Sequence, residues 1–125
     1  IDNFKEINDT YGHQTGDDVL VQIANQLKSL IGTRGICARW GGEELAVYIS
    51  NLLEDESLKI AGQIVKSIPF VTNPKVTISA GLVSWTRGSL LEYRELFLQA
   101  DMALYAAKNN GKNQFFMYKD EVGTK

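Results

Sequence analysis

The sequence predicts an α+β fold in which helices cover a sheet that contains an antiparallel hairpin. Three observations predict it. Helix-like and strand-like apolar periodicities alternate along the 125 residues, and two of the strand-like segments flank a glycine pair. In addition, 44% of the residues are apolar, which is enough for one buried core without disulfide bonds or a structural metal.

Two helical segments precede the first strand. Residues Lys5–Tyr11 predict a short helix that ends at Gly12, where glycine supplies a left-handed C-terminal position. A loop is expected over residues 13–16. Asp17 is then expected to cap a longer helix, in which apolar residues recur every three or four positions and predict one buried face: Leu20, Ile23, Ala24, Leu27, Leu30 and Ile31.

A β-hairpin is expected next. Residues 36–40 and 44–49 have the composition of two short strands. They flank Gly41 and Gly42, a pair that favours a tight turn of the primed type. The hairpin is therefore the antiparallel part of the predicted sheet.

The second half alternates helices and strands. Apolar spacing predicts a helix over residues 53–68, ended by Pro69. An interior strand rich in β-branched residues is expected over 76–83, a helix over 90–109 and a closing strand over 114–118.

With a strand before Ile1, these elements would form a ferredoxin-like βαββαβ core with one additional helix. Ile1 has the character of the end of such a strand, so we predict that this first strand is missing from the sequence as it stands. We expect a single domain over residues 1–118 and a frayed polar tail over residues 119–125.

Charge and hydropathy argue against several classes of function. The formal net charge is -2, so the molecule as a whole offers no field that would collect nucleic acid or an anionic membrane. No apolar run approaches the roughly 18 residues that a membrane-spanning helix needs. The single cysteine, Cys37, lies among apolar residues and excludes a disulfide framework.

Four polar residues are candidates for a binding site. Glu43 and Glu44 adjoin the glycine pair, and carboxylate oxygens suit Mg²⁺ that bridges nucleotide phosphates. Asn8 and Asp17 offer an amide and a carboxylate, a pair able to hydrogen-bond the edge of a guanine base. Simpler alternatives stay open: solvated surface charges for the glutamates, a turn residue for Asn8 and a helix cap for Asp17.

Three lysines near the predicted ends of elements are candidates for contacting phosphate: Lys5, Lys108 and Lys112. Each presents a flexible ammonium group. For each of them, an ordinary solvated surface charge is the alternative.

Four segments, in this order, resemble the motifs of the GGDEF family, the catalytic domains of bacterial diguanylate cyclases. The opening motif, IDNFKEINDTYGH at residues 1–13, continues as GDDVL at 16–20. The signature hairpin is RWGGEEL at 39–45. The two later motifs are VTISAG at 76–81 and ADMALYAAKNNGKN at 100–113. Together these segments cover essentially the whole chain.

The resemblance implies a reaction in which two GTP molecules are joined into cyclic di-GMP, with release of pyrophosphate, for bacterial second-messenger signalling. It implies that Asn8 and Asp17 bind the guanine base. It also implies a set of contacts to the triphosphate, made by three lysines and two backbone amides: Lys5, Lys108, Lys112, Asn3 and Phe4.

The resemblance further implies a metal site. Mg²⁺, with Mn²⁺ as an alternative, would be held by Glu43, by Glu44 and by the backbone carbonyl of Ile1. Glu43 would also be catalytic, assisting the deprotonation of the attacking hydroxyl group. Each domain would hold one GTP, so a homodimer and an upstream sensory or regulatory domain are implied as partners.

Three departures from the family pattern have consequences. The family's opening motif begins with an aspartate metal ligand just before the position of Ile1, so we expect activity in the parent protein and weak or absent activity in the chain as it stands. Leu45 replaces a phenylalanine, which we expect to affect packing more than chemistry. The Arg and Asp of the product-inhibition motif would fall at Gly32 and Gly35, so feedback inhibition through that motif is not expected.

Two other functions stay open. A catalytically inactive GTP-binding or regulatory module of the same fold would account for a missing aspartate. A ferredoxin-like RNA-binding domain would need a basic sheet face with exposed aromatic residues, and the acidic balance argues against it. The need for GTP predicts a cytoplasmic domain and leaves open a membrane-anchored parent protein.

Overall fold

The computed structural model describes residues 1–86 and 90–119. The helices and strands follow the predicted order, and they form two compact units, one over residues 1–78 and one from residue 79 onward. Of the predicted tail over residues 119–125, only Lys119 lies among the described residues.

The first unit begins with two helices that meet at one glycine. α1 spans Phe4–Tyr11 and α2 spans His13–Ile31. Gly12 lies between them with φ 93° and ψ 161°, a conformation that glycine adopts at little steric cost, so the chain changes direction within one residue. The predicted loop over 13–16 and the Asp17 cap are therefore wrong, because α2 begins four residues before Asp17.

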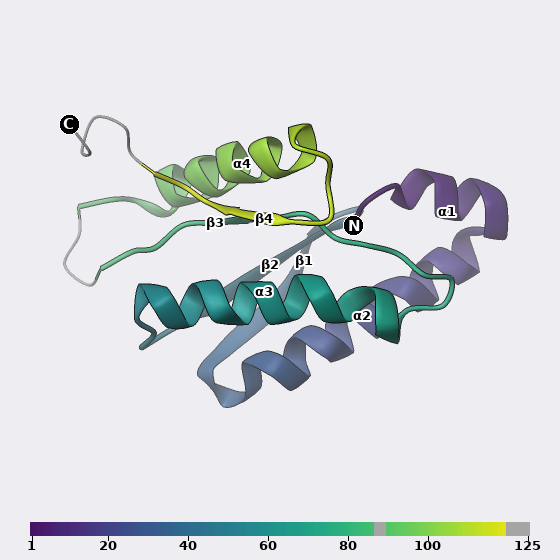
Figure 1. The fold of residues 1–125 in the computed structure, drawn as a ribbon, viewed down its shortest axis with the longest axis horizontal. Coiled ribbons are helices and arrows are strands. Elements are labelled where there is room, and N and C mark those ends of the chain that lie inside the picture. Colours follow the sequence, from purple (N-terminus) through teal and green to yellow (C-terminus); the bar gives the residue numbers. More distant parts are fainter. Residues whose placement is uncertain (87–89, 120–125) are drawn as a thin grey trace. The chain divides into compact units, whose positions relative to one another are not determined.

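The core of the first unit lies between α2 and α3, which spans Glu54–Val71 (Figure 1). Gln26 Nε2 of α2 donates a hydrogen bond to Ser67 Oγ of α3 at 3.0 Å. The predicted apolar face of α2 is confirmed for its most buried members. The buried apolar side chains of these two helices are Val19, Leu20, Ile23, Leu27, Ile31, Ile60, Ala61, Ile64, Val65 and Ile68.

The predicted end of α3 at Pro69 is wrong. The helix continues to Val71 and is capped by Thr72, whose Oγ1 donates to the carbonyl of Ile68 at 2.8 Å and accepts from the backbone nitrogen of Val76 at 3.1 Å. Pro69 is tolerated because it removes one N–H donor close to the end of the helix, where few later turns depend on it.

The predicted hairpin is confirmed. A short 3₁₀ turn over Gly32–Arg34 leads into β1, Gly35–Gly41, which pairs antiparallel with β2, Glu44–Ile49. The primed turn is wrong, because neither Gly42 nor Glu43 has the positive φ that such a turn requires. The pairing of the two strands shifts register between Arg39 and Gly41, an irregularity next to the turn.

The second unit is a β–α–β arrangement. β3, Ala80–Leu82, and β4, Phe115–Met117, pair in parallel, and α4, Tyr93–Asn109, is the crossover between them (Figure 1). The predicted strand over 76–83 is thus shortened to three residues. A strand needs a hydrogen-bonded neighbour along its whole length, and the apolar pattern of one segment does not reveal how far its neighbour extends.

α4 packs closely onto β3. A Cβ atom added to Gly81 would overlap the carbonyl of Ala100 and the amide of Leu104, so glycine allows the helix backbone to approach the strand directly. Ala103 and Ala107 are buried beside this contact.

Candidate functional site

The first two residues connect two distant parts of the first unit. The backbone nitrogen of Ile1 donates to the carbonyl of Glu43 at 3.1 Å, and that of Asp2 donates to the carbonyl of Thr77 at 3.0 Å. Two of the predicted metal-site residues, Ile1 and Glu43, are therefore direct neighbours through their backbones.

The start of α1 follows immediately. Asn3 has φ 56° and ψ 33°, a left-handed conformation that asparagine adopts more readily than most residues. Phe4, the first residue of α1, is buried, whereas Lys5 is exposed on the first turn. The amide groups at the start of a helix have no carbonyl partner within that helix and point outward along its axis. Asn3, Phe4 and Lys5, which were predicted to contact phosphate, thus lie together at the N-terminal end of α1.

Asn8 holds a buried polar atom for which the described residues supply no hydrogen-bond partner. Its Oδ1 is buried and, among the described residues, has no hydrogen-bond partner. It lies against Gly16 of α2, where an added Cβ would overlap it and would also approach the ring of Phe4 to 3.3 Å. A buried and unpaired acceptor is rare in folded proteins and calls for a specific explanation, and a role in the site is one such explanation.

Asp17 lies one residue beyond Gly16 on α2, with its carboxylate exposed. Because α2 begins at His13 and Asn8 lies within α1, neither residue has the alternative role of cap or turn. Asp17 borders a groove of about 380 Å³ between α2 and the hairpin, within the size range of small-ligand sites. The groove is lined by Asp17, Leu20, Val21, Ala24, Lys28, Cys37, Ala38, Arg39 and Leu45.

The hairpin turn presents both glutamates. Glu43 and Glu44 are exposed, and a Cβ added to either Gly41 or Gly42 would have no atom within 4 Å. The Arg39 side chain donates twice to the carbonyl of Gly42, from Nε at 3.1 Å and from Nη2 at 2.7 Å. The glycines of the turn therefore leave open space around it, and the Arg39 side chain holds its backbone.

The donor set suits a magnesium ion that arrives with a nucleotide. Two carboxylates, Glu43 and Glu44, and the Ile1 backbone belong to one neighbourhood of the chain. Over the part of the chain that the structure describes, no three His, Cys, Asp or Glu side chains are grouped closely enough to hold a metal by themselves. Mg²⁺ typically uses one or two carboxylates and completes its coordination with substrate phosphates and water.

Lys108 and Lys112 belong to the second unit. Lys108 lies in the last turn of α4, and Lys112 lies in the loop after it with φ 64°. This loop is held by Gln114, whose Nε2 donates to the carbonyls of Asn110 and Lys112 at 2.8 and 2.9 Å. The two lysines are thus four residues apart in sequence, at and just beyond the C-terminal end of α4.

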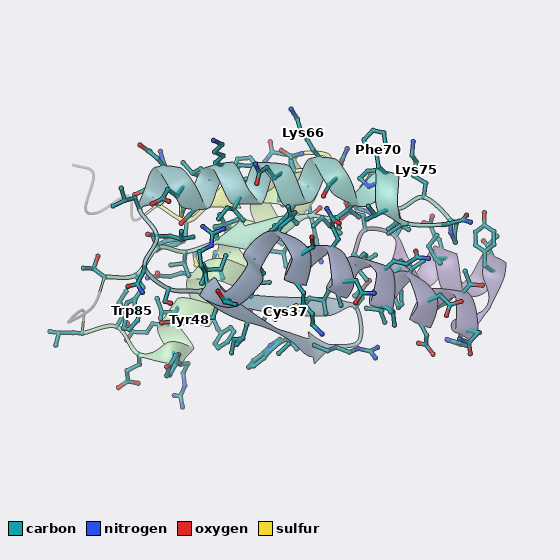
Figure 2. The ribbon with its side chains drawn as sticks, turned by 90° about the horizontal axis from the view of Figure 1, so that it is seen from below. Cys37, Tyr48, Lys66, Phe70, Lys75 and Trp85 are labelled. Atoms are coloured by element: carbon teal, nitrogen blue, oxygen red, sulfur yellow. The ribbon has the colours of Figure 1, made fainter. Side chains whose placement is uncertain are left out.

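Cys37 lies on β1 where the strand borders the groove (Figure 2). Partial burial raises the pKa of its thiol, and the nearby Lys28 ammonium opposes this by lowering it. The neutral thiol is therefore favoured, which suits a small apolar wall residue better than a nucleophile.

Three residues of this region were not predicted from the sequence. Asp2 is a buried acid, Gly16 makes room for Asn8, and Arg39 holds the hairpin turn. A glycine inside an amphipathic helix suggests a close contact, but the predicted loop over residues 13–16 placed Gly16 outside the helix. The roles of Asp2 and Arg39 depend on residues that only folding brings near them.

Comparisons with known proteins agree with the arrangement of these residues. The model of the family described as diguanylate cyclase, GGDEF domain, matches residues 1–114. The uncharacterized protein YtrP of Bacillus subtilis strain 168 is 47% identical over 118 residues, which make up 94% of this chain and 20% of YtrP. The probable diguanylate cyclase DgcF of Escherichia coli strain K12 is 37% identical over 133 residues, covering 98% of this chain and 42% of DgcF.

A solved structure is similar over nearly the whole chain. It is the active GGEEF domain of a diguanylate cyclase from Vibrio cholerae, with a TM-score of 0.85, 34% sequence identity and coverage of 97% of this chain and 80% of that one. No helix among the described residues is both long enough and apolar enough to cross a membrane. This chain spans less than half the length of YtrP and of DgcF.

The α+β prediction and the predicted resemblance are both confirmed by these similarities. The family match extends from the first residue through the hairpin and α4 to the loop before β4. The chain therefore belongs to the GGDEF family of diguanylate cyclase domains.

Proposed function

We propose that this domain condenses two GTP molecules into cyclic di-GMP and pyrophosphate, as the catalytic domain of a diguanylate cyclase. The observation that carries the proposal is the Oδ1 of Asn8, which is buried against Gly16 and has no hydrogen-bond partner among the described residues. It supports a polar ligand at this part of the opening motif, in a family described as diguanylate cyclase, GGDEF domain.

Guanine has the hydrogen-bonding groups that this pair needs. Its ring N–H and exocyclic amine are adjacent donors, which the exposed carboxylate of Asp17 can accept together. The amide of Asn8 is both donor and acceptor, so it can meet the remaining atoms of the base edge. Adenine presents an unprotonated ring nitrogen at the corresponding edge and would be repelled by the carboxylate.

The phosphates and the metal belong at the other end of α1. The backbone amides of Asn3 and Phe4 and the ammonium of Lys5 supply positive potential there, and Lys108 and Lys112 are proposed to join them. Mg²⁺, or Mn²⁺ in its place, would be held by Glu43, Glu44 and the carbonyl of Ile1. When bound, the metal would neutralise charge on the phosphates.

The bond changes require two domains. In each half of the reaction, a ribose hydroxyl on the GTP of one domain forms a bond to the α-phosphorus of the GTP on the other, and the bond to pyrophosphate breaks. Glu43 assists the removal of the hydroxyl proton. Because one domain holds one GTP, a homodimer is the active form, controlled by a regulatory region elsewhere in the protein. The need for GTP assigns the domain to the cytoplasm.

The test is the formation of cyclic di-GMP from GTP and Mg²⁺ by the full-length protein, compared with a Glu43→Gln variant of nearly identical shape. We expect product from the wild type and a loss of at least about 100-fold in the variant, the scale of a missing catalytic acid or base. A folded wild-type protein that binds GTP and makes no product would contradict the proposal and would indicate a GTP-binding regulatory module.

A further inference from the structure

Asp2 is the one acidic residue among the described buried side chains, at 5% exposure. Burying a carboxylate is costly unless it is hydrogen-bonded. Its Oδ2 accepts a hydrogen bond from Thr77 Oγ1 at 2.7 Å, and its backbone nitrogen donates to the carbonyl of the same residue at 3.0 Å. Asp2 is thus attached at two points to a residue 75 positions later in the chain.

Thr77 is a rigid partner. It lies between Val76 and Ile78, whose side chains are 5% and 8% exposed and anchor this segment in the core of the first unit. The burial of these two neighbours limits how far Thr77 can move away from Asp2. A hydroxyl bonded to a carboxylate is a charge-assisted hydrogen bond and is stronger than one between neutral groups.

The attached residue lies between groups of the proposed site. Ile1, immediately before it, is bonded to the Glu43 carbonyl, and Asn3, immediately after it, turns the chain into α1 through a left-handed conformation. The carbonyl of Ile1 and the amides of Asn3 and Phe4 therefore depend on the orientation of the two peptide groups that flank Asp2. Only a few backbone dihedral angles lie between Asp2 and the Ile1 carbonyl or the amides of Asn3 and Phe4, so holding Asp2 in place also restricts these groups.

We propose that Asp2 is a positioning residue of the GGDEF active site, and that its bond to Thr77 fixes the turn that carries the metal-binding carbonyl and the phosphate-binding amides. Asp2 does not itself contact the nucleotide. The inference rests on the proposed function, because it assigns Asp2 to the metal and phosphate end of that site. It assigns no role to Asp2 at the guanine end, where Asn8 and Asp17 lie.

The test compares two substitutions of Thr77 in the full-length protein. Thr77→Val keeps the shape and removes the hydroxyl donor, whereas Thr77→Ser keeps the donor and removes a methyl group. We expect Thr77→Val to raise both the KM for GTP and the Mg²⁺ concentration for half-maximal rate by about tenfold or more, the usual cost of losing a group that orients a metal ligand. Thr77→Ser should keep both values within about twofold of the wild type.

A purely structural role would give a different result. It would lower the thermal unfolding midpoint and the fraction of folded enzyme, but the KM and the Mg²⁺ requirement of the folded fraction would stay unchanged. Unchanged values in Thr77→Val, or equal losses in Thr77→Val and Thr77→Ser, would overturn the inference. An inactive wild type would instead contradict the proposed function, so the two failures are distinguishable.

A second variant covers the case in which Thr77→Val does not fold. Asp2→Asn keeps an oxygen that can accept from Thr77 and removes only the charge, so we expect a smaller shift of the same two values. If Thr77→Val folds, the double variant should be less impaired than the sum of the single effects, because Asp2→Asn weakens the same hydrogen bond that Thr77→Val removes. Full additivity, or an Asp2→Asn protein with wild-type KM and Mg²⁺ requirement, would overturn the inference.

Discussion

At the scale of single residues, the site contains a polar group that costs the protein stability. The Oδ1 of Asn8 is buried beside Gly16 without a partner among the described residues. Leaving such an acceptor unpaired costs about 1–3 kcal/mol, which a ligand donor would recover on binding. Stability and nucleotide affinity should therefore respond in opposite directions when Asn8 is replaced.

Asn8→Leu tests this directly, because leucine has a similar size and shape without polar atoms. We expect the free energy of unfolding to stay the same or rise by up to about 2 kcal/mol, since the unpaired acceptor is removed and leucine favours helices. The KM for GTP should rise by about tenfold or more. Denaturant unfolding and steady-state kinetics check both, with exposed Asp9→Ala as the control. A clear loss of stability with unchanged KM would show that Asn8 is structural.

Cys37 gives a prediction about pH. Partial burial raises the pKa of its thiol above the ordinary value of 9.0, with Lys28 opposing the shift. Folding therefore favours the protonated thiol, and its stabilising contribution is present below pH 9.0 and is lost as the pH rises through the higher folded pKa. We expect iodoacetamide to alkylate the native protein with a midpoint above pH 9.0. A midpoint below that of the unfolded chain would contradict this.

At the scale of elements, the contact between α1 and α2 depends on the absence of a side chain. A methyl group at Gly16 would overlap the Asn8 amide and press on the ring of Phe4. The two helices are joined by Gly12 alone, so neither can shift far to make room. The contact between Asn8 and Gly16 therefore packs α1 against α2 and also forms part of the proposed guanine-binding end of the site.

Gly16→Ala should lower the free energy of unfolding by about 1–3 kcal/mol, the usual cost of overpacking a tight contact. Gly41→Ala is the matched control, because the added methyl group there would meet no atom within 4 Å and should change stability by less than about 0.5 kcal/mol. Denaturant unfolding of the two variants measures the difference. Equal stabilities would mean that α1 moves away from α2 more easily than their junction suggests.

The hairpin gives a second prediction at this scale. Arg39 donates from two nitrogens to the Gly42 carbonyl, and Glu43 follows immediately. A lysine cannot reproduce this forked geometry, so Arg39→Lys should lower kcat by about tenfold while the exposed turn contributes little to stability. Arg34→Lys is the control, since Arg34 makes a single 3.5 Å contact with the Leu30 carbonyl. If Arg39→Lys kept the wild-type kcat, the backbone alone would be enough to hold the turn in its active geometry.

At the scale of the whole molecule, the proposed reaction needs two copies of the domain. Each copy is proposed to hold one GTP, and the bonds that form join nucleotides on different copies. The described residues of one copy contain one opening motif and one signature hairpin. Activity should therefore depend on association.

We expect the specific activity to rise with protein concentration and to level off once the dimer is saturated, because the rate follows the dimer population. Dilution series of cyclic di-GMP formation, together with sedimentation measurements, check this. Adding an excess of inactive Glu43→Gln protein to dilute wild type should alter the rate through mixed dimers. A constant specific activity from a species that sediments as a monomer would contradict the two-domain reaction.

The amino-acid sequence by itself determined the class of fold, the order of the elements and the family. Apolar periodicity is a local property, so the faces of α2 and α3 and the hairpin could be predicted from it. The motifs also identified the candidate residues of the site. The starts and ends of elements were less predictable, because they depend on single contacts such as the Thr72 hydroxyl that ends α3.

The tertiary structure decided what the local pattern does not contain. It places the Ile1 backbone against Glu43, leaves the Oδ1 of Asn8 unpaired beside Gly16, and bonds Asp2 to Thr77. The contacts of Ile1 and Asp2 join residues that are far apart in the chain, and the energies of all three contacts depend on burial and distance, which exist only after folding. The sequence therefore named most of the residues of the site, and only the folded chain showed how they are held.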